Sequence, residues 1–148
     1  LLPQIIEMVG SQSVVVVIDA KKRKLSKRYD VWIENATINT KIEPGKFAAQ
    51  VNDMGVGEIV INSIDQDGMM RGYDEKLIQL IFENSNIPIS ALGGSGSLEH
   101  MGNLINKFGI IGTSAGSFFV FKGKYRAVLI NYPRPDEKDQ LISNFLNK

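Results

Sequence analysis

The sequence contains no cysteine and only one histidine, His100. Without cysteine the chain can have neither a disulfide framework nor a thiolate metal site. A single histidine also lacks partners for a metal site, so we predict no metal and no cofactor. We expect His100 to be a surface or packing residue. The cysteine-free composition is typical of a reducing compartment, and a cytoplasmic location is expected.

Long apolar runs and an excess of charge are also missing. No apolar stretch reaches the roughly 18 residues of a membrane-spanning helix, and the first residues lack the basic start and cleavage site of a signal peptide. The 17 basic and 16 acidic residues leave a formal net charge of +1, which gives no indication of nucleic-acid binding. The basic cluster within residues 21–28 is interpreted as a solvated loop. We therefore expect neither a membrane nor a nucleic acid as partner.

What the sequence does have is an alternation of strand-like and helix-like segments. A chain of 148 residues that is 43% hydrophobic is long enough for one domain with a core. Apolar, strand-like runs begin near residues 14, 58, 88 and 110. Amphipathic segments with helical spacing cover residues 2–9, 44–54, 74–82, 98–108 and 136–146. Such βα units predict an α/β fold with four parallel strands and right-handed crossovers.

Residues 21–43 interrupt this alternation. The segment is polar and has strand-like patches at residues 29–33 and 37–42, which predicts a long loop that contains a hairpin. Excursions of this length are usually functional lids or binding loops. We expect Tyr29 and Trp32, which lie in it, to pack the hairpin rather than to stack on a ligand.

Acidic residues follow the first two strands, at the edge where parallel α/β folds bind ligands. Asp19 closes the first strand and is predicted to act as a general acid or base, with helix capping or loop ordering as the alternative. Asp65 and Asp67 follow the second strand. They either contact a substrate or form a turn, because Asp67-Gly68 is an ordinary turn dipeptide. Lys21 contacts either substrate or water.

Glycine-rich turns follow the last two strands. Gly93 and Gly94 precede one helix, and Ala115, Gly116 and Ser117 precede a short helical segment. Glycines let backbone N–H groups approach an anion, and a helix N-terminus favours negative charge, so the pair of turns predicts a phosphate site. Each turn alone also fits a tight turn that needs a positive φ. The variant Gly94→Val is expected to remove phosphate binding and to leave the fold intact.

Five segments, in order, resemble the cyclase subunit of imidazole glycerol phosphate synthase from its fifth strand onward. They are residues 14–21 (VVVVIDAK), 57–68 (GEIVINSIDQDG), 72–74 (GYD), 93–96 (GGSG) and 115–117 (AGS). The resemblance implies a (β/α)8 TIM-barrel family, with residues 1–148 as a single half-barrel domain of strands 5 to 8 and the excursion at 21–43. A full barrel needs about 250 residues. The upstream half, with the other catalytic aspartate, would lie outside this chain, and the chain alone should be inactive.

The resemblance also implies an activity in histidine biosynthesis. An ammonia-dependent cyclase/lyase would take ammonia from a glutaminase partner and convert a phosphorylated ribotide into imidazole glycerol phosphate and an aminoimidazole carboxamide ribotide. The aspartate that closes the family's fifth strand is one of two catalytic carboxylates, and it matches Asp19. The predicted substrate-binding residues are Lys21, Asn62, Asp65 and Asp67, and the predicted phosphate-binding residues are Gly93, Gly94, Ala115, Gly116 and Ser117.

Departures from the family pattern leave alternatives open. Asn62 and Leu92 stand where histidine-pathway cyclases usually have Thr and Ser, and Gln66 replaces the usual Arg. Residues 121–133 look more like cyclase-like paralogues found beside surface-polysaccharide genes, which would deliver ammonia to a sugar amidotransferase. Another possibility is a non-catalytic half barrel that binds phosphate. An open four-stranded sheet should in any case pair with an upstream half or with a second copy.

Overall fold

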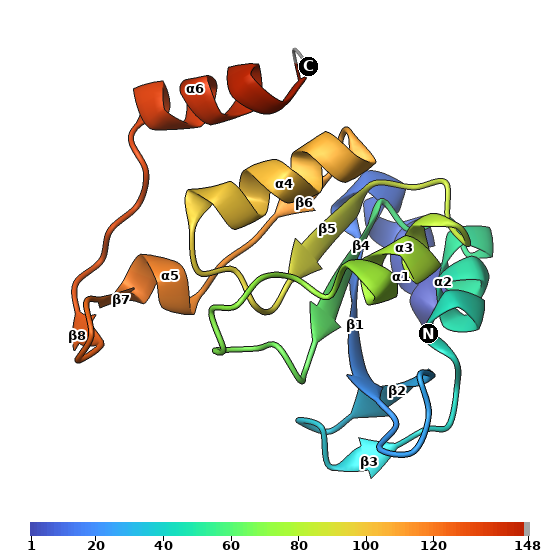
Figure 1. Ribbon diagram of the computed structural model, residues 1–148. Coiled ribbons are helices and arrows are strands. Elements are labelled where there is room, and N and C mark those ends of the chain that lie inside the picture. Colours follow the sequence, from blue (N-terminus) through green and yellow to red (C-terminus); the bar gives the residue numbers. More distant parts are fainter. Residues whose placement is uncertain (147–148) are drawn as a thin grey trace.

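The computed structural model describes residues 1–146 as an α/β fold around one sheet (Figure 1). Its four parallel strands are β1 (Val15–Lys22), β4 (Glu58–Ser63), β5 (Ile89–Leu92) and β6 (Gly112–Thr113). Beyond β1 the sheet continues antiparallel through β2 (Tyr29–Ile33) and β3 (Ile38–Asn39), in the order β3-β2-β1-β4-β5-β6. In Figure 1 the arrows of β1, β4 and β5 point the same way, so their carboxyl ends meet at one edge. The predicted α/β class with a parallel sheet is confirmed.

Helices connect the parallel strands. They are α1 (Leu2–Val9), which a 3-10 turn (Ser11–Ser13) joins to β1, α2 (Pro44–Asp53), α3 (Glu75–Phe82) and α4 (Leu98–Phe108). The side chains of Glu43, Asp74 and Ser97 cap α2, α3 and α4 by accepting hydrogen bonds from N–H groups of the first turn. Those N–H groups have no acceptor inside the helix, so each cap fixes where its helix begins.

The core lies between these helices and one face of the sheet. Ile18, Ile59 and Ala91 from the strands are fully buried there, together with Ile81 and Leu104 from the helices. The other face of β1 is open: Val15 is 50% and Val17 is 57% exposed. The apolar run at residues 14–18 predicted a strand covered on both faces. The described chain covers only one face of β1, because α2, α3 and α4 all pack on the same side.

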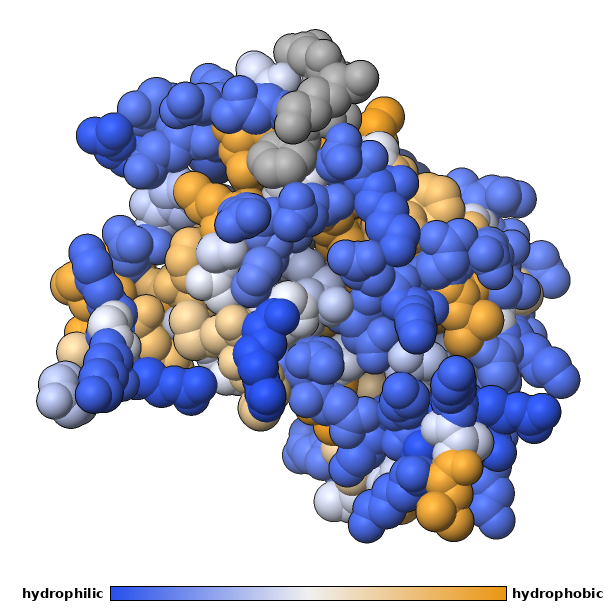
Figure 2. Space-filling model, in the orientation of Figure 1, coloured by the Kyte–Doolittle hydropathy of each residue, from blue (hydrophilic) through white to orange (hydrophobic). Residues whose placement is uncertain are grey.

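The last part of the described chain extends away from the sheet. It contains α5 (Ser117–Val120), a small hairpin of β7 (Phe121–Lys122) and β8 (Ala127–Val128), and α6 (Pro135–Leu146), which contacts α4. Figure 2 shows apolar side chains beside α5, with hydrophilic ones around the β7–β8 hairpin. Val128 in β8 and Ile130 and Tyr132 after it are exposed. Across the described residues, every helix is too short or too polar to cross a membrane.

A buried carboxylate holds the β2–β3 hairpin to the end of β1. Asp30 is 3% exposed and accepts hydrogen bonds from Arg23 Nε at 2.9 and 3.0 Å, from Arg23 Nη2 at 2.6 Å and from Asn39 Nδ2 at 3.0 Å. The hydrogen bonds from Arg23 hold the pKa of Asp30 below its usual range, although burial opposes them, and the same contact raises the pKa of Arg23.

This carboxylate makes stability depend on pH. Because the folded pKa of Asp30 is depressed, its contribution is complete above the unfolded pKa near 3.9 and is lost as the pH falls through the folded pKa. We expect Asp30→Asn to lower the free energy of unfolding by about 1–3 kcal/mol near neutral pH and to weaken its loss below pH 4. Urea unfolding between pH 2 and pH 7 measures both effects. The matched control is Asp53→Asn, at an exposed position. If Asp30→Asn lost stability below pH 4 as steeply as the unmodified chain, the depressed pKa of Asp30 would be contradicted.

Candidate active site

The carboxyl edge of the sheet brings Asp19, Asn62 and Leu92 into one row. In the parallel ladder Asp19 pairs with Asn62, and Asn62 pairs with Leu92. Side chains alternate along a strand, so Asp19 shares the open face with Val15 and Val17. Asn62 Nδ2 donates a hydrogen bond to Asp19 Oδ1 at 2.8 Å. The half-buried Asp19 carboxylate is thus oriented through one oxygen, and its Oδ2 receives no hydrogen bond from the described residues.

Asn62 has an unused acceptor at the same place. Its Oδ1 is buried and has no hydrogen-bond partner among residues 1–146. A buried acceptor without a donor costs about 1–3 kcal/mol, so this oxygen favours a donor from water or from a ligand. The Asn62 side chain therefore orients the Asp19 carboxylate, while its own Oδ1 is buried beside Gly93.

The two aspartates that follow β4 have different environments. The N–H groups of Gln66 and Asp67 donate to the Ser63 carbonyl oxygen at 3.1 and 3.0 Å, which forms the turn. Asp65 Oδ2 accepts a hydrogen bond from Lys22 N at 2.9 Å and so ties this turn to the end of β1. Asp67 is exposed, and within the described residues its carboxylate makes no hydrogen bond. Asp65 orders the backbone, while Asp67 is the carboxylate that is open to a ligand.

Lys21 lies on the hairpin side of the edge. Its Nζ is 5.4 Å from the ring centroid of Trp32, a distance at which a cation interacts with an aromatic face. The phenol of Tyr29 donates to both carboxylate oxygens of Asp74, at 2.9 and 3.0 Å, and burial raises its pKa. Tyr29 therefore packs the hairpin against the start of α3, as predicted from the sequence. The described contacts of Lys21 are with the hairpin rather than with Asp19.

The first glycine-rich turn is tightly packed against the backbone of neighbouring segments, at Ser63 and Gly72. Gly93 and Gly94 have φ angles of 88° and 105°. A Cβ at Gly93 would lie 2.7 Å from the Ser63 carbonyl oxygen, and a Cβ at Gly94 would overlap the carbonyl of Gly72. The expectation that Gly94→Val leaves the fold intact is therefore wrong, because the valine has to displace backbone. Gly116 is different: its φ is −100°, and no atom lies within 4 Å of a Cβ built there.

Ser95 is a residue that the sequence analysis missed. It is 5% exposed, and its Oγ has no hydrogen-bond partner among the described residues. The Ser97 hydroxyl, by contrast, caps α4 by accepting from His100 N at 3.2 Å, and His100 Nδ1 accepts from Gly96 N at 3.1 Å. His100 thus has a packing role, as predicted. The Ser95 hydroxyl is buried just before α4. The only sequence signal that could have identified this residue is its position between Gly94 and Gly96.

The second turn lies beside the first. Ser114 N donates to the Ala91 carbonyl oxygen at 2.9 Å, and the Tyr73 phenol donates to the Ser114 carbonyl oxygen at 2.9 Å. Burial raises the pKa of Tyr73, and the nearby Ser95 hydroxyl opposes this shift. A Cβ at Gly68 would lie 3.8 Å from Ser117 Oγ, so the turn after β4 also approaches this point. Three loops of the carboxyl edge converge here: residues 65–68, 93–97 and 115–117.

The converging loops contain backbone N–H groups, hydroxyls and the N-terminus of α4, which together suit an anion. A metal would need a different set. Among the residues that the structure describes, no three His, Asp or Glu side chains are grouped so that they could hold a metal ion. The edge thus has a group of anion-compatible N–H and hydroxyl donors at one end and the Asp19 carboxylate at the other.

Comparison with known proteins identifies the family. Residues 1–126 match the family described as histidine biosynthesis protein, whose fold is the (β/α)8 barrel. Over 133 residues, 90% of this chain and 52% of each relative, the chain is 52% and 47% identical to proteins of Leptospira borgpetersenii and Leptospira interrogans that are both named "Putative imidazole glycerol phosphate synthase subunit HisF". It is 40% identical over 122 residues, 82% of this chain and 48% of the relative, to the imidazole glycerol phosphate synthase subunit HisF of Clostridium botulinum. The chain spans about half the length of these relatives. It belongs to the histidine biosynthesis protein family, of which the subunit HisF is a member.

Proposed function

We propose that the chain is the carboxyl-terminal half of a (β/α)8-barrel cyclase, the HisF-like subunit of imidazole glycerol phosphate synthase. The observation that carries the proposal is the oriented Asp19 carboxylate beside two glycine-rich turns at one sheet edge. Residues 1–148 would form one half-barrel domain, with strands β1, β4, β5 and β6 as the fifth to eighth barrel strands. The open face at Val15 and Val17 supports this, because a closed barrel fills its interior with such side chains.

In the proposed reaction Asp19 is the general acid or base. A carboxylate held through Oδ1 by Asn62 offers Oδ2 to a proton of the closing ring, and a fixed direction favours proton transfer. The second carboxylate would come from the upstream half. Asp67 and Asn62 would hold the ribotide through its hydroxyl or amide groups. Lys21 and Asp65 are proposed to act at the border of the site, where Lys21 contacts the hairpin and Asp65 contacts the end of β1.

The phosphate of the ribotide would bind between the two glycine-rich turns. Backbone N–H groups of Gly93, Gly94, Gly116 and Ser117, with Ala115 in the same turn, would surround it near the N-terminus of α4. The unpartnered Ser95 hydroxyl would donate to it. A glutaminase subunit, HisH-like, would supply the ammonia.

Replacement of Ser95 separates a phosphate site from a simple turn. We expect Ser95→Ala to weaken binding of ribose 5-phosphate roughly tenfold, because one hydrogen bond to a charged group is lost. The melting temperature should fall little, since the Ser95 hydroxyl lies near the Tyr73 phenol but has no partner at full hydrogen-bond geometry among the described residues. Calorimetric titration and thermal unfolding measure the two quantities.

The matched control is Ser97→Ala, which removes the cap of α4 and should cost about 1 kcal/mol of stability. Ser95→Ala protein that binds the sugar phosphate as tightly as the unmodified chain would show that the loop is only a turn.

The activity is tested on the full-length protein. Supplied with ammonium salt and the ribotide, it should release the aminoimidazole product, and this chain without its upstream half should not. Asn62, Leu92 and the segment 121–133 also favour a second candidate, a cyclase-like paralogue that hands ammonia to a sugar amidotransferase. Such a protein would form no imidazole product and would support amidine formation only after the amidotransferase is added.

A further inference from the structure

We propose that a cavity between the β1–β2 connection, α2 and α3 binds a small organic polyanion, a molecule with an apolar body and at least two phosphate groups. The cavity measures about 930 Å3, and small-molecule sites typically occupy about 300–1,000 Å3. Its lining comes from the hairpin region and from the outer helices, away from the open sheet face of Asp19. The proposal therefore does not depend on the function proposed above.

Five cations from separate segments line this cavity. Lys27 and Arg28 come from the β1–β2 connection, Lys41 follows β3, and Lys46 and Lys76 belong to α2 and α3. Among residues 1–146 none of the five forms an ion pair. A solvated charge run explains Lys27 and Arg28, which are sequence neighbours, but it does not explain three more cations from other elements. Their convergence creates a positive potential that attracts an anion.

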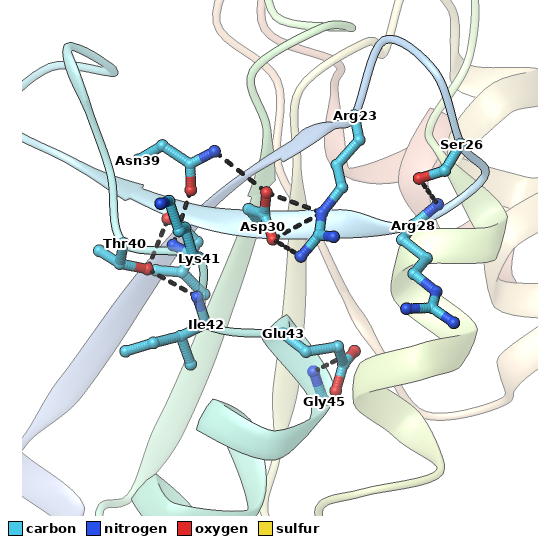
Figure 3. Close-up of polar contacts among 11 residues, drawn as sticks. Arg23, Ser26, Arg28, Asp30, Asn39, Thr40, Lys41, Ile42, Glu43 and Gly45 are labelled. Carbon is cyan, nitrogen blue, oxygen red and sulfur yellow. Dashed lines mark hydrogen bonds and ion pairs between the residues drawn. The ribbon is translucent and has the colours of Figure 1, made fainter.

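The carboxylates nearest to these cations are already engaged. Glu43 uses both carboxylate oxygens to cap α2, with N···O distances of 2.9 Å. Asp30 accepts from Arg23, which also lines the cavity. Figure 3 shows that the Arg23 side chain points toward Asp30. Arg28 extends from the same β1–β2 connection, beside the segment that contains Ile42 and Glu43. The five cations are exposed and have no carboxylate within ion-pair distance among the described residues, so their charge is available to an anionic ligand.

Part of the wall is apolar. Ile42 is 41% exposed, Leu80 is half-buried, and the ring of Tyr29 completes this side. Covering an exposed apolar side chain is favourable by about 25 cal/mol per Å2, which inorganic phosphate cannot exploit. A single phosphate group would also be too small to fill the cavity, and water would occupy most of its volume. A nucleoside diphosphate combines the required charge with an apolar body of suitable size.

Calorimetric titration with ADP, inorganic pyrophosphate and adenosine tests the two features of the ligand. With ribose 5-phosphate in excess to fill the phosphate turn, we expect one saturable site for ADP, weaker binding of pyrophosphate, no measurable binding of adenosine, and loss of ADP affinity as salt rises. Pyrophosphate that binds as tightly as ADP would overturn the role of the apolar wall. Adenosine that binds as tightly as ADP would overturn the role of the cations.

Paired charge variants locate the site. The double variant Lys46→Gln/Lys76→Gln should lower ADP affinity at least about tenfold, because two charge-assisted contacts are lost. Lys122→Gln/Lys124→Gln removes the same charge from the β7–β8 hairpin and should leave the affinity unchanged. An excess of ribose 5-phosphate should leave the affinity for ADP unchanged, which separates this cavity from the proposed phosphate turn. Equal affinity losses in the two double variants, or displacement of ADP by ribose 5-phosphate, would overturn the proposal.

Discussion

Asp19→Asn is expected to lower kcat of the complete cyclase at least about 10²-fold, the low end for a positioned acid or base. The amide cannot take up a proton as a carboxylate does, although it has nearly the same shape. Asn62 would still find an oxygen acceptor 2.8 Å away, so the β1–β4 contact should survive. The loss would therefore report on proton transfer rather than on folding.

The assay reads aminoimidazole release from the full-length protein with ammonium salt and ribotide. Asp53→Asn, at the exposed end of α2, removes the same charge far from the sheet edge and should keep the unmodified rate. Asn62→Ala should give an intermediate loss of kcat, because it removes the group that orients Asp19 and keeps the carboxylate itself; the lost ribotide contact should appear in KM. Product formation by Asp19→Asn at the unmodified rate would refute the role of this carboxylate.

Apolar periodicity and turn residues in the sequence were sufficient to predict the fold class. Helices α1 and α4 have the predicted boundaries, and the strands lie where apolar runs end in polar turns. The exposure of Val17 could not be predicted in the same way. A run of five β-branched residues has the same pattern whether one face or two are covered, and coverage depends on where distant helices pack.

The site was also hard to predict because it depends on contacts between residues that are far apart in the sequence. Asp19 and Asn62 are 43 residues apart, and only the parallel register of β1 and β4 makes them neighbours. The Arg23 pair with Asp30 depends likewise on the tight β1–β2 connection. Ser95 was missed because the absence of a hydrogen-bond partner is a property of the folded loop. The sequence did indicate the three loops, since each follows the carboxyl end of a strand.

The open sheet face leads to the second large effect, on assembly. At micromolar concentration the chain should be a dimer or larger, or should bind its upstream half, because Val15 and Val17 remain exposed on a strand face. Val17→Lys should raise the dissociation constant of this contact at least about 10²-fold, because an unpaired charge would have to be buried there. Light scattering and sedimentation velocity give the masses over a concentration series.

Leu25→Lys is the matched control, since Leu25 is fully exposed in the β1–β2 connection and not on the sheet face. Its mass distribution should match that of the unmodified chain. Addition of the upstream half should convert self-associated chain into a one-to-one complex, because both partners would cover the same face. Val17→Lys should resist this conversion as well. A stable monomer that unfolds cooperatively at micromolar concentration would contradict the assembly prediction, since it would show that the exposed valines need no cover.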